Sequence, residues 1–185
     1  MAHTSTPWSR LAARTARGIL ARKGVSFDDV AEKISAIGIP ESFRGAGSRI
    51  QRGTYSLAYF LALLRAVGAE CPAQWTKFVD SDESWEAAAS HVLLHEISAQ
   101  GLSIEQLSHR LETFGTAVNP ERLTAQVASG EFPFTLMLQT ALVAPIPEFI
   151  RFVDHRDLAE AAGMSSALST AKAHGQQRRH AHPRP

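Results

Sequence analysis

An internal repeat constrains the fold of this chain more than any other feature. A displacement of 77 positions pairs aromatic residues, glycines and serines without a gap: Trp8 with Trp85, Gly24 with Gly101, Ser26 with Ser103, Gly53 with Gly130, and Tyr55 with Phe132. Both copies also end alike, with KFVD at 77–80 and RFVD at 151–154. Self-similarity at one fixed displacement indicates a duplicated domain of about 75 residues.

Each copy has the periodicity of short α-helices. In residues 8–23 apolar residues recur at steps of three and four, and Gly24 supplies a stop signal. Ser26 with Asp29, and Ser103 with Gln106, have the spacing of capping boxes that begin a second helix. Residues 41–52 and 54–68 continue as a third and a fourth helix, and the fourth supplies core through Leu57, Phe60, Leu61 and Leu64. The sequence therefore predicts an all-α protein with two tandem domains of four to five helices, at 8–80 and 85–158.

The third segment of the first copy, PESFRGAGSRIQRG, has two distinct faces. At about 100° per residue, Phe43, Ala46 and Ile50 fall on one side. A cationic and hydrogen-bonding strip occupies the other side: Arg44, Ser48, Gln51 and Arg52, with Arg49 near its edge. Gly45 and Gly47 each cost a helix about 1 kcal/mol relative to alanine. We therefore expect this helix either to begin late, near Ser48, or to complete its first turn only on a ligand.

The second copy keeps the apolar side of this helix and loses the strip. The outward positions are replaced one by one: Glu121 for Arg44, Ala125 for Ser48, Gln126 for Arg49, Ala128 for Gln51, and Ser129 for Arg52. Leu123 and Val127 remain apolar at the buried positions. The comparison indicates a shared scaffold on which only the first copy carries cationic chemistry.

Charge is distributed unevenly along the chain. Residues 1–80 carry 11 Lys and Arg against 6 Asp and Glu, a formal charge of +5, whereas residues 81–158 carry 4 against 11, a charge of −7. Residues 159–185 carry +3, are rich in small and basic residues, and over 165–185 are predicted to be a disordered basic tail. This pattern suits a polyanion at the first copy and at the tail, and a different partner at the second copy, although charge also scatters between domains by chance.

The segments GVSFDDVAEKI and SRIQRGTYSLAYFLALLRAVGA resemble the Cro and lambda-repressor type of helix-turn-helix domain (XRE-like). More narrowly, they are similar to an uncharacterised bacterial family with the pattern tryptophan, Gly-Val-Ser and Arg-Gly-Thr-Phe/Tyr. The resemblance covers residues 8–70, and 85–145 more weakly. It implies that the helix matching 41–52 enters the major groove. By position, Arg44, Ser48 and Arg49 would then face bases, and Gln51 and Arg52 would contact the DNA backbone.

These observations predict a transcriptional regulator that binds double-stranded DNA through its first repeat. Basic side chains of the first two helices, which equally suit a solvated face, could add phosphate contacts: Arg10, Arg14, Arg17, Arg22, Lys23 and Lys33. We expect the second repeat to pack on the first, form a homodimer, or hold a protein partner. The competing hypothesis is a helical protein-interaction module, an antitoxin or adaptor, that does not bind DNA.

Other functional classes have little support in the sequence. There is no phosphate loop, nucleophile elbow or carboxylate pair, so we expect neither an enzyme nor a cofactor. His91 and His95 lack a third ligand at metal spacing, so we expect no metal site. Cys71 is the only cysteine, so the chain cannot form an internal disulfide, as suits a reducing compartment. No apolar run approaches the roughly 20 residues that cross a bilayer. We therefore expect a cytoplasmic protein without membrane contact.

Overall fold

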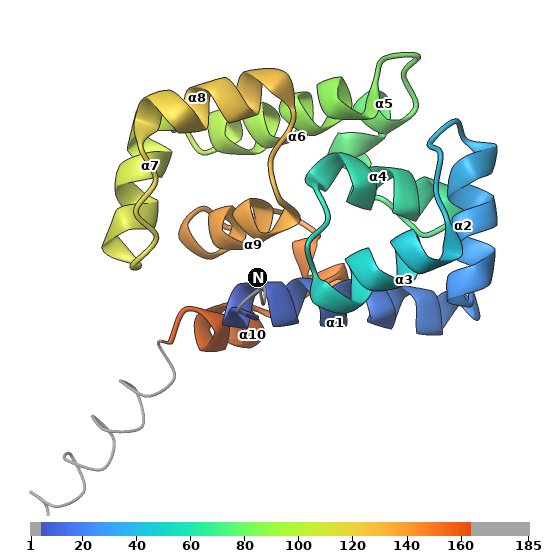
Figure 1. Cartoon of the computed structure of the whole chain (residues 1–185). Helices are drawn as coiled ribbons and strands as arrows, with labels where there is room; N and C mark the ends of the chain where they lie inside the picture. The colour runs from blue at the N-terminus through green and yellow to red at the C-terminus, as the bar shows by residue number, and fades with distance from the viewer. Residues whose placement is uncertain (1–4, 164–185) are drawn as a thin grey trace, which may run out of the picture.

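The structure is a computed structural model that describes residues 5–163, and over this range it is all-helical (Figure 1). The first repeat contains α1 (Pro7–Lys23), α2 (Phe27–Ala36), α3 (Phe43–Arg52), α4 (Leu57–Ala66) and α5 (Thr76–Val79). The second contains α6 (Trp85–Ala99), α7 (Ile104–Thr113), α8 (Pro120–Ser129), α9 (Phe134–Val143) and α10 (His155–Ala161). Short 3-10 turns span Ala73–Trp75 and Phe149–Arg151. Since residues 5–163 contain no strand, the all-α prediction is confirmed. No helix in this range is both long and apolar enough to cross a membrane.

Side-chain caps set the starts of the first helices of both repeats, α1 to α4 and α6 to α8. The capping boxes of α2 and α7 are present: the Ser26 and Ser103 side chains accept hydrogen bonds from the backbone N–H groups of Asp29 and Gln106. Helix α4 begins at Leu57, because the Ser56 side chain accepts from the Tyr59 N–H and ends the extended connection there. The predicted fourth helix, 54–68, was therefore too long at both ends. The predicted tail, 165–185, lies outside the described residues.

Helix α3 is complete from its first turn, contrary to the late start that its glycines suggested. The Ser42 side chain accepts a hydrogen bond from the Gly45 N–H at 3.1 Å. This N-cap offsets part of the free energy that the low helix propensity of glycine costs α3. Ala46 and Ile50 are buried as predicted. Phe43 is not: it is 52% exposed, so the prediction that it faces the core was wrong. Phe43 is the first residue of the helix and lies about one turn before Ala46, the first buried residue of α3.

The two repeats exchange their first helices. In repeat one, α1 packs on α3 of its own repeat and on α9 of the other. In repeat two, α6 packs on its own α8 and on α4 of the first repeat (Figure 1). Since α1 corresponds to α6, and α4 to α9, these two contacts are equivalent under the repeat. The packing therefore resembles a symmetric dimer with exchanged helices, contained in one chain.

An antiparallel backbone bridge lies at the centre of this symmetry. The Leu57 N–H donates to the Phe132 carbonyl at 3.1 Å, and the Phe134 N–H donates to the Tyr55 carbonyl at 2.9 Å. Tyr55 corresponds to Phe132 and Leu57 to Phe134, so each hydrogen bond is the repeat-related copy of the other. A pseudo-two-fold axis passes between the α3–α4 and α8–α9 connections.

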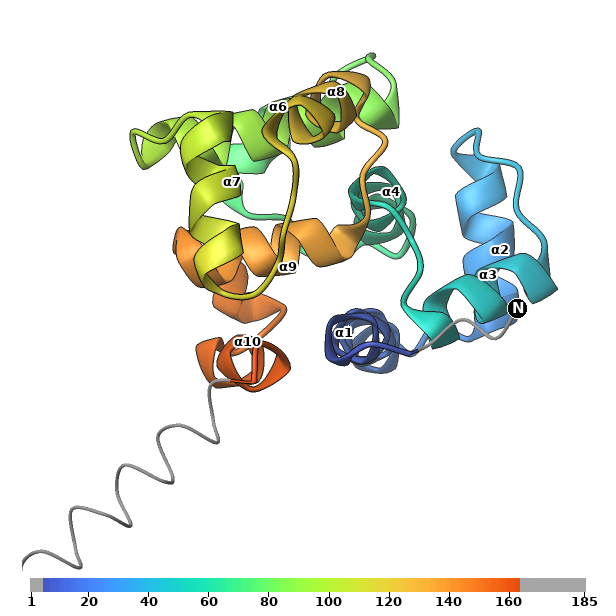
Figure 2. The same ribbon diagram turned by 60° about the vertical axis from the view of Figure 1, so that its left-hand side comes forward.

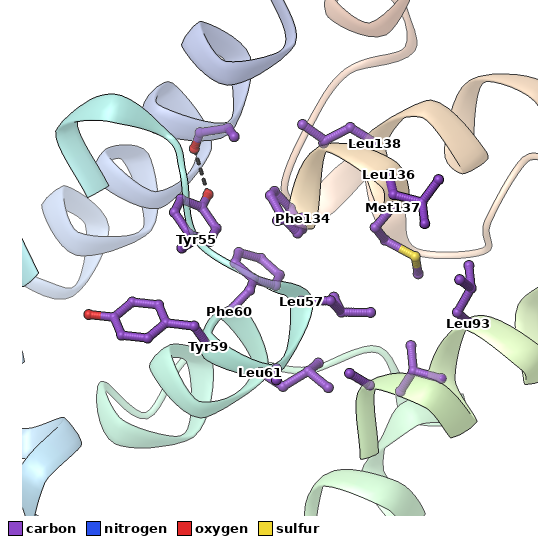
Figure 3. Close-up of a cluster of buried hydrophobic side chains, with 14 of the residues drawn as sticks. Tyr55, Leu57, Tyr59, Phe60, Leu61, Leu93, Phe134, Leu136, Met137 and Leu138 are labelled. Carbon is purple, nitrogen blue, oxygen red and sulfur yellow. Dashed lines mark hydrogen bonds between the residues drawn. The ribbon is translucent and has the colours of Figure 1, made fainter. Parts of the chain in front are cut away.

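One hydrophobic core runs through both repeats around this axis (Figure 3). The rings of Phe60 and Phe134 stack at a centroid distance of 4.1 Å, and neither residue is exposed to solvent. The Tyr55 ring stacks on Phe134, and its hydroxyl donates to the Ala12 carbonyl of α1 at 2.6 Å. Tyr55 therefore connects α1 to the backbone bridge, and α3 packs on the helix that this contact holds in place.

Candidate nucleic-acid interface

Helix α3 is held against α1 and α2 by Ala46 and Ile50, which directs its remaining face to solvent. Its last residue is followed by Gly53, at φ +63°, where the chain passes directly over the first turn of α1. A Cβ atom at this position would lie 1.9 Å from the carbonyl oxygen of Ser9. Only glycine permits this approach, so Gly53 both ends α3 and sets the distance between α3 and α1.

The structure leaves four of the five predicted site residues exposed on α3: Arg44, Arg49, Gln51 and Arg52. Ser48 is half-buried between them. Within the described residues, no carboxylate lies within ion-pairing distance of Arg44 or Arg52. Their guanidinium groups are therefore available to an anionic ligand.

Arg49 has a different environment, because it covers a buried carboxylate. Its Nε lies 3.3 Å from Glu41 Oε2, and the Glu41 side chain is only 4% exposed. The guanidinium carbon lies 5.2 Å from the centroid of the Tyr59 ring, over its face. Burial, and then the neighbouring Glu41 carboxylate, raise the pKa of the Tyr59 hydroxyl, so the phenol stays neutral there. Arg49 therefore compensates the buried charge of Glu41, and only its outer half reaches solvent.

Gly45 makes room for this cluster. A Cβ atom at Gly45 would lie 2.3 Å from Glu41 Oε1, which instead accepts a hydrogen bond from the Ser42 N–H at 3.0 Å. The glycine that weakens the helix by propensity thus lets the carboxylate of Glu41 lie against the first turn of α3. This is a physical reason for a glycine inside the helix.

We expect Arg49→Ala to lower the free energy of unfolding by about 1–3 kcal/mol, since Glu41 would keep its buried charge without a partner. Equilibrium urea unfolding would measure the change. The double variant Glu41→Gln/Arg49→Ala should recover part of the loss, because the uncompensated charge is removed. Arg44→Ala, on the same helix and without an ion pair, is the matched control and should change stability by less than about 0.5 kcal/mol. An Arg49→Ala protein as stable as this control would contradict the assignment.

A signal for the role of Arg49 was present in the repeat. Glu41, Arg49 and Tyr59 correspond to Val118, Gln126 and Leu136 in the second copy. All three members of the cluster are lost together there, as expected if they form one structural unit. The sequence comparison of the α3 face alone could not separate this loss from the loss of a ligand contact.

Arginines of α1 extend the basic surface beyond α3. A cleft of about 410 Å³ lies between α1, the last turn of α3, and α10. Basic and amide side chains line it from two helices: Arg10, Arg14, Arg17, Gln51 and Arg52. Asp157 and Glu160 of α10 face the same cleft. Arg22, in contrast, points to the other side of α1, where it donates to the Arg151 carbonyl at 3.3 Å.

The second repeat has no comparable surface. Its α8 carries Glu121, Ala125, Ala128 and Ser129 at the positions of the strip, and all four are exposed. On α6, the Nδ1 of His91 contacts a Glu83 carboxylate oxygen at 3.0 Å, and His95 packs edge-on against Phe78. Residues 5–163 contain no group of three or more His, Cys, Asp or Glu side chains arranged to hold a metal ion.

Fold and surface together define the class: an all-helical protein built from two tandem copies of one domain, only the first of which presents a basic helix face. The chain belongs to the family described as a domain of unknown function (DUF6471), which matches it twice, over residues 8–71 and 85–147. The predicted duplication is thus confirmed. No curated protein and no solved structure matches the chain.

Proposed function

We propose that the chain is a cytoplasmic transcriptional regulator that binds double-stranded DNA through the outer face of α3, in the manner of a Cro or lambda-repressor type of helix-turn-helix domain. The observation that carries the proposal is the difference between α3 and α8. The two helices occupy equivalent places, yet Arg44 and Arg52 project to solvent from α3 while Glu121 and Ser129 stand at the same positions of α8. A guanidinium can pair with two acceptors on guanine or with phosphate, whereas no guanidinium stands at the equivalent positions of α8.

The packing of α2 against α3 supports the same assignment. Helix α3 is held from behind by α1 and α2, so its exposed face is free to enter a groove. Arg44 and Ser48 lie in its first half and would face base edges, whereas Gln51 and Arg52 lie in its last turn and would contact the DNA backbone. The protein would act by occupying a site rather than by chemistry. One α3 covers one half-site, so we propose that two chains bind adjacent half-sites about one helical turn apart.

We expect the variant Arg44→Ala/Arg52→Ala to lose most of its affinity for duplex DNA and to keep its fold. Each lost phosphate contact would reduce the slope of log K against log salt by about 0.9. Fluorescence anisotropy with a labelled duplex of about 20 base pairs, over a series of salt concentrations, measures both quantities. Arg122→Ala is a control for the loss of a positive charge outside α3, because it removes one guanidinium group from the exposed face of α8.

Unchanged affinity in the double variant would contradict the proposal. It would favour instead a module that binds an acidic protein partner. Arg49 is left intact in this test, because its removal would disturb the cluster with Glu41 and Tyr59 and confuse a folding defect with a binding defect.

A further inference from the structure

The cleft between α1, α3 and α10 concentrates positive charge in one concave place. In Figure 2, α1 is seen almost end-on, with α3 on one side and α10 on the other. Arg10, Arg14 and Arg17 follow one face of α1 at steps of three and four residues, and Arg52 reaches the cleft from α3. Arginines at these steps project side by side from a helix. The cleft thus collects four guanidinium groups from two helices.

One of the four groups already holds an anion. Arg14 Nη2 lies 3.0 Å from Asp157 Oδ1, and the two side chains are 59% and 34% exposed. Within the described residues, Arg10, Arg17 and Arg52 have no carboxylate within ion-pairing distance. Glu160, one turn along α10, lines the same cleft without contacting a guanidinium at that distance. The carboxylates of α10 therefore lie where an external anion would bind.

The position of the cleft matches the end of the proposed recognition helix. Arg44 and Arg52 are eight residues apart, which corresponds to about 12 Å along a helix, close to the width of the major groove. A helix that spans the groove from Arg44 brings its last turn to the strand of phosphates at the groove edge. Gln51 and Arg52, in that last turn, are also the α3 residues that line the cleft.

We propose that this cleft binds a phosphate group of the DNA backbone, and that Asp157 occupies the position of that phosphate in the free protein. This inference rests on the proposed function. It adds the cleft as a second DNA contact beside α3, and it makes the Asp157 carboxylate a competitor of the bound phosphate. A carboxylate and a phosphate bind guanidinium groups through the same charge-assisted hydrogen bonds. Bound phosphate would meet repulsion from Asp157 unless the Arg14–Asp157 pair opened. Helix α10 therefore weakens DNA binding by the free-energy cost of opening that pair.

The test compares Asp157→Asn with Asp154→Asn in the full chain. Each change removes one negative charge, but Asp154 is exposed at the N-cap before α10 and does not line the cleft. In Asp157→Asn the phosphate no longer has to displace an ion-paired carboxylate from Arg14, so DNA binding should release about one more counterion. The salt slope for a labelled mixed-sequence duplex should therefore steepen by about 0.9, and the affinity at 0.1 M salt should rise about tenfold. Glu160→Gln should also tighten binding, by a smaller factor, since it removes a carboxylate that is not ion-paired. Asp154→Asn should match the wild type.

The outcomes separate the two proposals. Equal behaviour of Asp157→Asn and Asp154→Asn, with affinity still lost in Arg44→Ala/Arg52→Ala, would overturn the cleft proposal and leave DNA binding standing. Failure of the wild-type protein to bind the duplex at low salt would overturn both. A third measurement separates DNA from free phosphate as the source of the anion. Inorganic phosphate at matched ionic strength should raise the melting temperature no more than chloride does. If phosphate raised the melting temperature more than chloride did, and Arg14→Ala removed this effect, the ligand of the cleft would be free phosphate and not the DNA backbone.

Discussion

Gly53→Ala should destabilise the protein by at least about 3 kcal/mol in equilibrium urea unfolding. Two effects combine at this position. An alanine at φ +63° is strained by about 1–2 kcal/mol, and its Cβ would lie 1.9 Å from the Ser9 carbonyl oxygen and 2.9 Å from the Ala13 nitrogen. Both contact atoms belong to the backbone of α1, so neither can move aside as a flexible side chain would. Relief requires α3 to shift away from α1, which opens the contact that buries Ile50.

Gly24→Ala separates the two effects. Gly24 has the same φ of +63°, but a Cβ atom there meets nothing within 4 Å. The control variant therefore measures the cost of the left-handed backbone alone, about 1–2 kcal/mol. If Gly53→Ala were no less stable than Gly24→Ala, the close approach of α3 to α1 would be wrong. Gly130, where a Cβ atom would lie 1.9 Å from the Glu86 carbonyl oxygen, should behave like Gly53.

Phe134→Ala should lower the free energy of unfolding by about 3–5 kcal/mol, as for other fully buried phenylalanines. Phe134 belongs to the second repeat, but its ring stacks on Phe60 and Tyr55 of the first. The lost packing is therefore shared by both repeats. We expect a single cooperative unfolding transition in the wild type and in the variant, with the variant midpoint lowered for probes in either repeat.

Trp8 and Trp85 provide a way to check this, because one lies on α1 and the other on α6. Phenylalanine substitutions at the other tryptophans, including buried Trp75, would isolate each signal. Ile150→Ala, at an exposed side chain in the second repeat, is the control and should cost little. Two separate transitions, with only the second affected by Phe134→Ala, would show that the repeats fold independently and would contradict the shared core.

The sequence predicted most of the helices because their signals are local. Capping serines, periodic apolar residues and terminal glycines lie within a few residues of the elements that they specify, so Ser26 and Gly24 identify helix ends without any knowledge of the fold. The displacement of 77 positions added the duplication, which the family match bears out.

The exchange of first helices could not be predicted in this way. The apolar face of α1 is the same whether it packs on α4 of its own repeat or on α9 of the other. The choice depends on the bridge between Leu57 and Phe132 and on the packing around it, which involves residues far apart in the chain. The same limit explains the misplacement of Phe43, since a helical projection gives a side but not the extent of the surface that covers it.

The sequence predicted which residues share the outer face of α3, but not the contacts that these residues make. Arg44, Ser48, Gln51 and Arg52 lie on one solvent face as predicted from the period of the helix. Arg49 lies at its edge, and its partner Glu41 precedes the helix, where periodicity carries no information. The cleft was also missed, because Asp157 lies more than a hundred residues from Arg14 and α10 has no counterpart in the first repeat.

The pseudo-two-fold axis has an evolutionary consequence. In a dimer of identical subunits, every substitution appears at both symmetric places, so a change that suits one place must be tolerated at the other. A single chain that contains both halves is free of this constraint. Glu121 can replace the equivalent of Arg44 on one side while the arginine persists on the other, and the shared interior remains intact. Covalent fusion thus allows two halves with one architecture to acquire opposite surfaces.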